Sequence, residues 1–316
     1  MLLYIILFLF LLLLSISFFV VLNKLVVKTQ WWQNFFVYTK QFKNKEQYDI
    51  VNVGSNPARF AFFYEDVMGQ NWSTGTQGLD FDLLVLKEYQ SHLKKGAVVL
   101  LPIVAFSSVS GYLGTPKSLS YLSKFASIIK ESHFDKKYNI ARINRYCKYP
   151  LFYNSKAFIY LLHDEKKDER LHVTENCLPL DEMRNDAQSW IEVWKKEFRI
   201  NELNGILPEH LQEGRRKSID MMCEMITFLK EMGMKPVIIS PPMSISLMKY
   251  FTPEVREAYI YSFIKAIQSM VDVPYLDYLD SEFQKNNYYY NALFLNLHGR
   301  KEFTKEVLKD LKLSLK

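Results

Sequence analysis

Cysteine is scarce in this sequence, which has only Cys147, Cys177 and Cys223 among its 316 residues. The three are far apart and show no C-x-x-C spacing, which argues against a disulfide framework and a zinc ribbon. The chain also lacks the H-E-x-x-H, D-x-D-x-D-G and G-x-x-x-x-G-K-[ST] patterns. We therefore expect no metal site, nucleotide site or other cofactor, and the thiols are expected to be structural.

A strong excess of charge of one sign is also absent. The 40 Lys and Arg residues face 34 Asp and Glu residues, and the net charge of +6 is dispersed along the chain. A nucleic-acid partner is therefore not expected. Apolar residues make up 49% and charged residues 23%, which excludes a disordered or collagen-like chain.

The one long apolar run lies at the start of the sequence. Residues Leu2 to Leu22 carry no charge, and a helix of about 20 such residues crosses the hydrocarbon core of a bilayer. The run lacks the basic start, the short apolar core and the small-residue cleavage site of a signal peptide. We therefore expect residues 1–23 to be an uncleaved transmembrane anchor, with residues 2–22 in contact with the lipid bilayer.

The residues after this run bear on the membrane side of the remaining chain. Four positive charges follow the span: Lys24, Lys28, Lys40 and Lys43. Taken literally, the positive-inside rule places the remainder in the cytoplasm, although the rule is weak for one anchor before a long domain. Trp31 and Trp32 are typical of interfacial residues. Since no second run of 18 apolar residues follows, we expect a single-pass membrane protein with one water-soluble body.

Beyond residue 46, short apolar runs alternate with stretches of helical spacing. The expected strands are residues 49–53, 97–103, 236–240 and 273–276. The expected helices are residues 81–93, 208–232 and 253–271. This alternation predicts an α/β domain with a mostly parallel sheet that is covered on both faces. Gly96 is expected to cap the C-terminus of the helix before the second strand.

The expected domain organisation follows from these elements. Residues 24–46 form a connector between the anchor and an α/β domain over residues 47–316. Residues 134–206 are rich in charged and aromatic side chains and contain no clear strand. We expect them to be a helical insertion.

Ser55 is the first candidate for chemistry, because ligands of open α/β sheets bind beyond the carboxyl ends of strands. It follows the first expected strand directly, and Gly54 permits a tight turn there. A helix that begins near Pro57 would point backbone N–H groups at this turn, where they can stabilise an oxyanion. The alternative is that Ser55 only caps the helix. A second loop, residues 71–78, carries Gly75 and could offer a further backbone N–H group.

The order of these segments resembles the SGNH (GDSL-like) hydrolase superfamily, and within it the membrane-anchored bacterial members associated with cell-surface polysaccharides and teichoic acids. The segments that carry the resemblance are Gly54-Ser55, the loop 71–78, the turn at Lys95-Gly96, residues 235–242 and the C-terminal blocks 291–296 and 299–304. The resemblance covers roughly residues 47–312, apart from the insertion. It implies a flavodoxin-like three-layer α/β/α domain that lies outside the cytoplasm. It also implies that Ser55 is the nucleophile and that Gly75 and Asn71 are oxyanion or substrate-binding residues.

The sequence departs from this family where the family keeps its base. The last block of the family holds Asp-x-x-His before Leu-Asn, and this alignment places Asn291 at the Asp position and Phe294 at the His position. Residues 102–108 also lack the Asn that the family supplies to its oxyanion hole. A serine hydroxyl is a poor nucleophile unless a base takes its proton. His298, about one helical turn after Phe294, is the candidate displaced base, and the alternative is a surface histidine.

Two functions from different classes remain open, and a third is more distant. The first is a membrane-anchored esterase or O-acyltransferase that acts on acyl groups of a cell-surface polysaccharide, with Ser55, Gly75 and His298 in its site. The second is a catalytically inactive SGNH-like protein that binds a glycan, an acyl donor or a partner protein of a polysaccharide-modification assembly. The third is a scaffold that faces the cytoplasm. We favour the enzyme hypothesis because the sequence contains Ser55 and its glycine turn.

Overall fold

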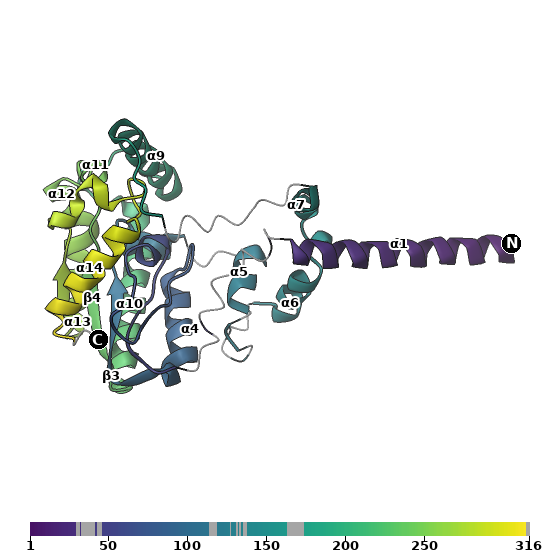
Figure 1. The fold of residues 1–316 in the computed structure, drawn as a ribbon, viewed down its shortest axis with the longest axis horizontal. Coiled ribbons are helices and arrows are strands. Elements are labelled where there is room, and N and C mark those ends of the chain that lie inside the picture. The colour runs from purple at the N-terminus through teal and green to yellow at the C-terminus, as the bar shows by residue number, and fades with distance from the viewer. Residues whose placement is uncertain are drawn as a thin grey trace. The chain divides into compact units, whose positions relative to one another are not determined.

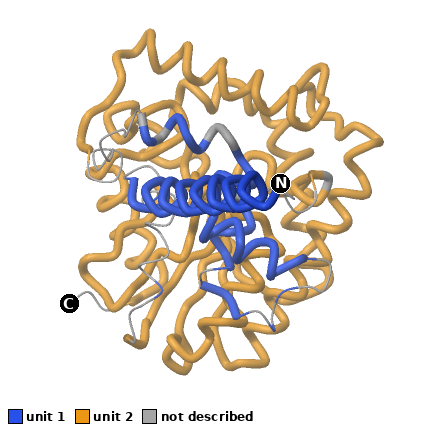
Figure 2. The backbone as a smooth tube through the Cα atoms, turned by 90° about the vertical axis from the view of Figure 1, so that its right-hand side faces the viewer, with its two compact units in different colours: residues 1–44, 116–168 blue, residues 45–115, 169–316 orange. Residues whose placement is uncertain are grey.

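The chain divides into two compact units, which Figure 2 shows in separate colours. The computed structural model describes residues 1–29, 32, 42, 46–113, 119–126, 128–130, 132, 134, 138–162 and 174–313. The smaller unit combines residues 1–44 with 116–168, and the larger unit combines residues 45–115 with 169–316. Most of the expected connector lies outside the described residues, as do Trp31, Lys40 and Lys43.

The larger unit is built on a five-stranded sheet whose pairings are all parallel (Figure 1). Its strands are β1 (Tyr48–Asn52), β2 (Gly69–Asn71), β3 (Leu93–Pro102), β4 (Lys235–Ser240) and β5 (Tyr275–Asp277). They lie in the order β2-β1-β3-β4-β5, which is the order of flavodoxin-type sheets. The chain adds β2 on one side of β1 and the later strands on the other side. The order of the sheet therefore reverses between β1 and β3. The expectation of an α/β domain with a mostly parallel sheet is confirmed.

The four expected strands are present with shifted bounds, and the structure adds β2. The three residues of β2 include no apolar side chain, and they are held by pairing with β1, from Ile50–Gly69 to Asn52–Asn71. The expectation for Gly96 is wrong. The preceding helix ends at Tyr89 and a 3-10 turn leads into β3, where Gly96 has a φ of 78°.

Helices connect the strands of the larger unit. After β1 and β2 come α3 (Asn56–Arg59) and α4 (Leu79–Tyr89), and after β3 come the 3-10 helix η3 (Ser107–Tyr112), α9 (Leu180–Phe198) and α10 (Glu209–Glu231). Beyond β4 lie α11 (Ile245–Met248), α12 (Pro253–Arg256), the π-helical turn η7 (Glu257–Tyr261) and α13 (Ser262–Met270). Two 3-10 turns, η8 (Glu282–Gln284) and η9 (Asn286–Tyr288), and then α14 (Leu297–Asp310) follow β5. The three expected helices correspond to α4, α10 and the run from α12 to α13.

The smaller unit contains α1 (Leu2–Lys28), which is long and apolar enough to cross a membrane. Its other described elements are α5 (Leu119–Ala126), α6 (Ile140–Lys148), η5 (Pro150–Phe152), η6 (Ser155–Phe158) and α7 (Ile159–Leu162). Asn23 is buried near the end of α1, and its Oδ1 accepts a hydrogen bond of 2.9 Å from Leu151 N. Trp32 is only 2% exposed and packs on Tyr146, with ring centroids 5.5 Å apart. The side chain of Trp32 therefore packs against α6 within the smaller unit.

The stretch expected to be an insertion, residues 134–206, contains α6, α7 and α9 and no strand among its described residues. It is divided between the two units: residues up to 168 belong to the smaller unit, whereas α9 belongs to the larger one. Phe106, which follows β3, attaches α9 to the rest of the larger unit. The centroid of its ring lies 5.2 Å from those of Trp194 and Phe198 on α9 and 5.3 Å from that of Tyr259.

Because Phe106 is buried among these rings, we expect Phe106→Ala to lower the free energy of unfolding by about 3–5 kcal/mol through the lost contacts and the cavity left behind. Phe106→Leu keeps most of the volume and should cost clearly less. The midpoint of urea unfolding of the purified chain, followed by circular dichroism, measures both changes. Equal midpoints for the Ala variant and the original chain would show that Phe106 does not hold α9.

Candidate functional site

The turn that carries Ser55 lies at the carboxyl end of β1, next to the point where the sheet reverses its order. Gly54 has a φ of +117°, and a β-carbon on it would lie 2.9 Å from Ala58 Cβ. Only glycine fits this turn without strain. Gly54 N donates a hydrogen bond of 2.9 Å to Asp82 Oδ1, and Gly54 O accepts one of 3.2 Å from Thr74 N. The backbone directly before Ser55 is therefore held on both sides.

Gly75 lies beside the residue that follows Ser55. A β-carbon on Gly75 would approach Asn56 Oδ1 to 3.1 Å, and the neighbouring Thr74 N is the group that bonds to Gly54 O. The structure therefore brings together Ser55 and Gly75, the two loop residues that the resemblance pairs.

Asp82 is a buried carboxylic acid beneath this turn that the sequence reasoning missed. Its Oδ1 accepts hydrogen bonds from Gly54 N and from Gln77 Nε2, the latter of 2.5 Å. Gln77 Oε1 accepts in turn from Thr74 Oγ1 at 2.9 Å. Burial raises the pKa of Asp82 to about 7, because removal from water disfavours the charged carboxylate. The signal in the sequence was a second acidic residue in the first turn of a helix, after Asp80.

The side-chain amide of Asn71 is used in hydrogen bonds that hold the fold. Its Nδ2 donates to the carbonyl groups of Arg59 and Phe62, at 3.1 and 3.2 Å. Its Oδ1 accepts from Ser73 N and from Asn52 Nδ2, both at 3.0 Å. Asn71 therefore ties the chain after α3 to β2, and both of its amide hydrogens are used in doing so.

The Ser55 hydroxyl is half-buried and makes no hydrogen bond to any residue in the described part of the chain. Ser55 occupies the position before α3, but its side chain does not cap that four-residue helix. The capping alternative therefore does not account for Ser55. The described histidines do not act on it either, because no hydrogen bond joins it to His92, His210 or His298. His133, His163 and His172 lie outside the described residues.

Phe294, which the resemblance aligns with a histidine, packs against the segment that Ser55 begins. Its ring stacks on Phe60, directly after α3, with centroids 4.6 Å apart and planes 26° apart. Further contacts join the two ends of the larger unit here. Arg300 Nη2 donates to Phe62 O at 2.9 Å, and Phe63 N donates to Thr304 Oγ1 at 2.9 Å. The final loop and the Ser55 turn therefore lie together.

Asn291 and His298 both have other roles in this loop. Asn291 Oδ1 accepts hydrogen bonds from Leu293 N and Phe294 N, at 3.0 and 2.8 Å, and so closes the backbone turn that presents Phe294. His298 is exposed in the first turn of α14, and its ring stacks on Tyr288 with centroids 5.3 Å apart. His298, the candidate base, is therefore a surface histidine, which was the alternative interpretation of this residue.

A group of aromatic side chains adjoins Phe294, and we call Phe60, Trp190, Trp194 and Phe294 the aromatic surface. Trp190 meets Phe294 edge to face at 5.8 Å, and Trp194 lies 5.7 Å from Trp190, one turn along α9. Trp190, Trp194 and Phe294 are partly exposed, whereas Phe60 is buried. Asp186 Oδ2 accepts from Ala292 N at 3.0 Å and so fixes α9 to the final loop. The sequence reasoning missed both tryptophans, although their spacing of four residues was a signal.

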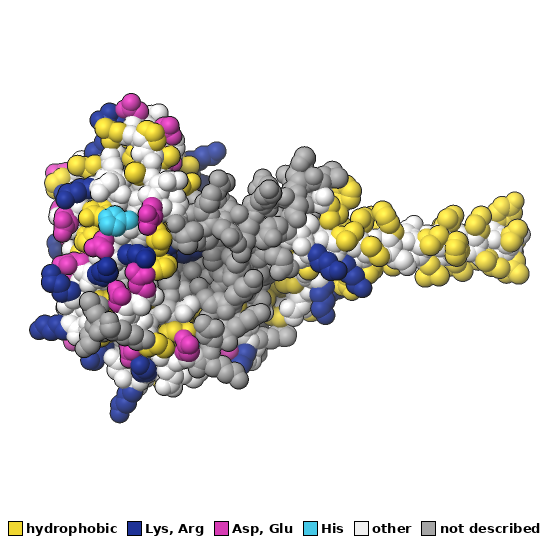
Figure 3. All heavy atoms as spheres, viewed as in Figure 1, with side chains coloured by type: hydrophobic (Ala, Val, Ile, Leu, Met, Phe, Trp, Pro, Cys, Tyr) yellow, Lys and Arg dark blue, Asp and Glu magenta, His cyan; other side chains and the backbone are white. Residues whose placement is uncertain are grey.

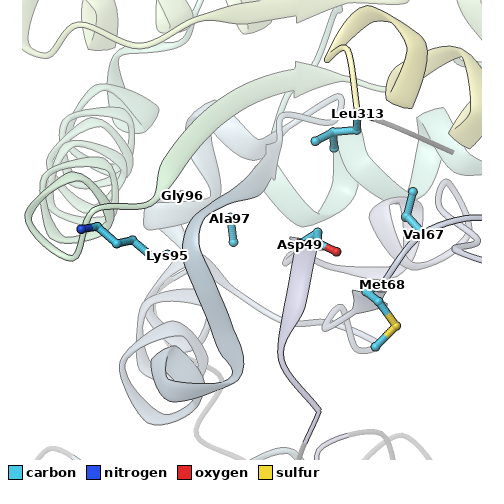
Figure 4. A pocket seen from close by; sticks show the side chains of 7 residues that line it. All are labelled: Asp49, Val67, Met68, Lys95, Gly96, Ala97 and Leu313. Carbon is cyan, nitrogen blue, oxygen red and sulfur yellow. The ribbon is translucent and has the colours of Figure 1, made fainter. Parts of the chain in front are cut away.

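A cavity of about 310 Å³ lies elsewhere in the larger unit, at the amino ends of β1 and β3 (Figure 4). Asp49, Gly96 and Leu313 are among the residues that line it. Asp49 forms an ion pair of 2.8 Å with Lys94. Because Ser55 follows the carboxyl end of β1, this cavity and Ser55 belong to opposite ends of the same strand.

The raised pKa of Asp82 makes a prediction about stability. The folded chain holds this proton up to about pH 7, whereas the unfolded chain releases it near its ordinary pKa of 3.8, so the stability from this group falls as the pH rises between these values. We expect Asp82→Asn, which keeps an acceptor for Gly54 N, to remove this fall. Its melting temperature should exceed that of the original chain above pH 7 and approach it below about pH 4. An identical pH dependence of melting in both proteins would contradict the assignment, and Asp82→Ala, which removes the acceptor, should melt lower throughout.

No protein-family model matches this sequence, and no curated protein matches it either. Its function therefore has to be inferred from the arrangement of its own residues around Ser55 and Phe294.

Proposed function

We propose that the chain is a membrane-anchored, catalytically inactive SGNH-like protein that binds a cell-surface glycan at the aromatic surface. In this proposal the larger unit has the three-layer α/β/α architecture of that superfamily and lies outside the cytoplasm, as in the members it resembles. The observation that carries the proposal is the stack of Phe294 on Phe60. It occupies the position in the final loop where the superfamily keeps its base.

The chemistry of the remaining groups supports the absence of catalysis. A serine attacks an ester only when a nearby base accepts its proton, and a phenyl ring has no group that can do so. Asn291 cannot supply the charge that stabilises a protonated histidine, and its Oδ1 is already bonded to two backbone N–H groups. The exposed ring of His298 stacks on Tyr288. The esterase or O-acyltransferase hypothesis would need another base at Ser55.

The partly exposed rings of Trp190, Trp194 and Phe294 support a glycan as the ligand. The face of an aromatic ring is electronegative, and it attracts the polarised C–H groups that line one face of a pyranose. Binding sites for small ligands combine such apolar surfaces with a few polar groups. Asn56 and the backbone of Gly75, next to Ser55, supply polar groups near the start of α3.

The loss of catalysis is tested with a fluorophosphonate probe, which labels activated serines. We expect the purified full-length chain and Ser55→Ala to be labelled equally weakly, because no base activates Ser55. The readout is in-gel fluorescence, with a heat-unfolded sample as background. Labelling that disappears in Ser55→Ala would instead establish a serine esterase or acyltransferase.

Glycan binding is tested on α9. We expect Trp190→Ala to weaken the affinity for the purified surface polysaccharide of the source organism about fivefold or more, since a stacked aromatic side chain contributes on the order of 1–3 kcal/mol. Val193→Ala is the matched control, because Val193 lies exposed on the same helix outside the aromatic surface. Isothermal titration calorimetry compares the two variants. Equal affinities would show that Trp190 does not bind the glycan.

A further inference from the structure

The smaller unit exposes a group of apolar side chains beside the apolar helix α1. They are Phe152, Tyr153, Phe158 and Ile159, between η5 and α7, and we call them the collar. Phe152 is 61% exposed and Ile159 is 51% exposed. Aromatic and branched side chains grouped in this way on a water-facing surface mark an interaction site.

The contacts of the collar with α1 fix its level along the helix. Phe152 stacks on Phe19, with ring centroids 6.0 Å apart, and Leu151 N bonds to Asn23 Oδ1. At 1.5 Å per residue, the uncharged run Leu2–Leu22 is about 30 Å long, which equals the thickness of the hydrocarbon core. Phe19 then lies inside the edge of that core, and Phe152 lies at the same depth.

Positive charge gathers just beyond this level. Lys24 and Lys28 follow the apolar run on α1, and α6 carries Arg142, Arg145 and Lys148 on its exposed surface. None of these five side chains forms an ion pair with a residue in the described part of the chain. Figure 3 shows Lys and Arg side chains together near the base of α1.

The composition of the smaller unit has the same bias. By sequence it holds 15 of the 40 Lys and Arg residues but only 5 of the 34 Asp and Glu residues. The larger unit is therefore acidic overall, and the net positive charge of the protein comes from the smaller unit. Unpaired cations beside an apolar anchor are attracted to the anionic headgroups of a bilayer.

We propose that the collar is a second membrane contact, in which Phe152, Phe158 and Ile159 insert at the edge of the hydrocarbon core and the basic side chains of α6 bind anionic headgroups. The occupant of this surface is the same bilayer that surrounds α1. An amphipathic helical segment with aromatic and basic side chains is suited to such an interface. The proposal rests on α1 spanning the membrane, and a second contact would restrict how the smaller unit tilts on it.

The test measures the depth of single fluorescent labels in the full-length protein in phosphatidylcholine vesicles that contain phosphatidylglycerol. The background is Cys177→Ser, because the thiol of Cys223 is buried and burial raises the pKa of Cys147 to about 11, which suppresses alkylation of both. Labels are placed by Phe152→Cys, Ile159→Cys, Leu12→Cys and Ile206→Cys. Ile206 is the matched control, since it is 69% exposed and lies in the larger unit.

We expect labels at 152 and 159 to lose fluorescence to shallow doxyl-labelled lipids and to be protected from aqueous iodide. The label at 206 should show the reverse, and the label at 12 should respond to deep doxyl lipids. Two positions in the collar are used because Phe152→Cys also removes the stack on Phe19. Arg142→Gln with Arg145→Gln should reduce the lipid quenching at 159, and only in vesicles that contain phosphatidylglycerol.

The outcomes separate the two levels of the proposal. Quenching of the label at 12 without quenching at 152 and 159 would overturn the collar and leave the anchor in place. Protection of 159 from iodide without lipid quenching would mean that a second copy or a partner protein covers the collar, which also overturns the proposal. No lipid quenching at 12 would overturn the anchor and the collar together, whereas glycan binding at Trp190 is measured independently.

Discussion

The stack of Phe294 on Phe60 is the contact on which the candidate site depends, because it joins the segment after β1 to the segment after β5. Phe60 ends the short helix after Ser55, and Phe294 is presented by a turn that the Asn291 side chain closes. Around this pair, Arg300 and Thr304 of α14 bond to the backbone after α3. A histidine at position 294 would replace the ring that stacks on Phe60. The loop can therefore supply either this aromatic contact or a base at that position, but not both. In this chain Phe294 supplies the packing.

The backbone of the Ser55 turn is held by hydrogen bonds on both sides of Gly54. Gly54 has a backbone conformation that other residues rarely adopt, and the buried carboxyl group of Asp82 holds its N–H group. A buried acid that is hard to ionise costs stability near neutral pH. Such an arrangement is reasonable if the turn still positions a ligand. In the proposed function, a site without a base binds a ligand without transforming it.

Much of the fold was predictable because buried parallel strands are continuous apolar runs, as in β3 and β4. β2 was not, since Gly69–Asn71 has no apolar residue and exists as a strand only through its pairing with β1. Ser55 and Gly75 were found because both follow the sheet in loops, and Asn291 and Phe294 by their place in an ordered block. Trp190 could not be placed in this way. Its position depends on tertiary contacts of α9, namely Asp186 with Ala292 N and Trp194 with Phe106.

The account is tested most directly by hydrolysis of an activated ester such as p-nitrophenyl acetate, measured for the full-length chain and for Asn291→Asp with Phe294→His, each with and without Ser55→Ala. The account predicts that the original chain shows no hydrolysis that depends on Ser55. Any such hydrolysis should appear only when the carboxylate and the imidazole are both introduced. Ser55-dependent hydrolysis by the original chain would contradict it.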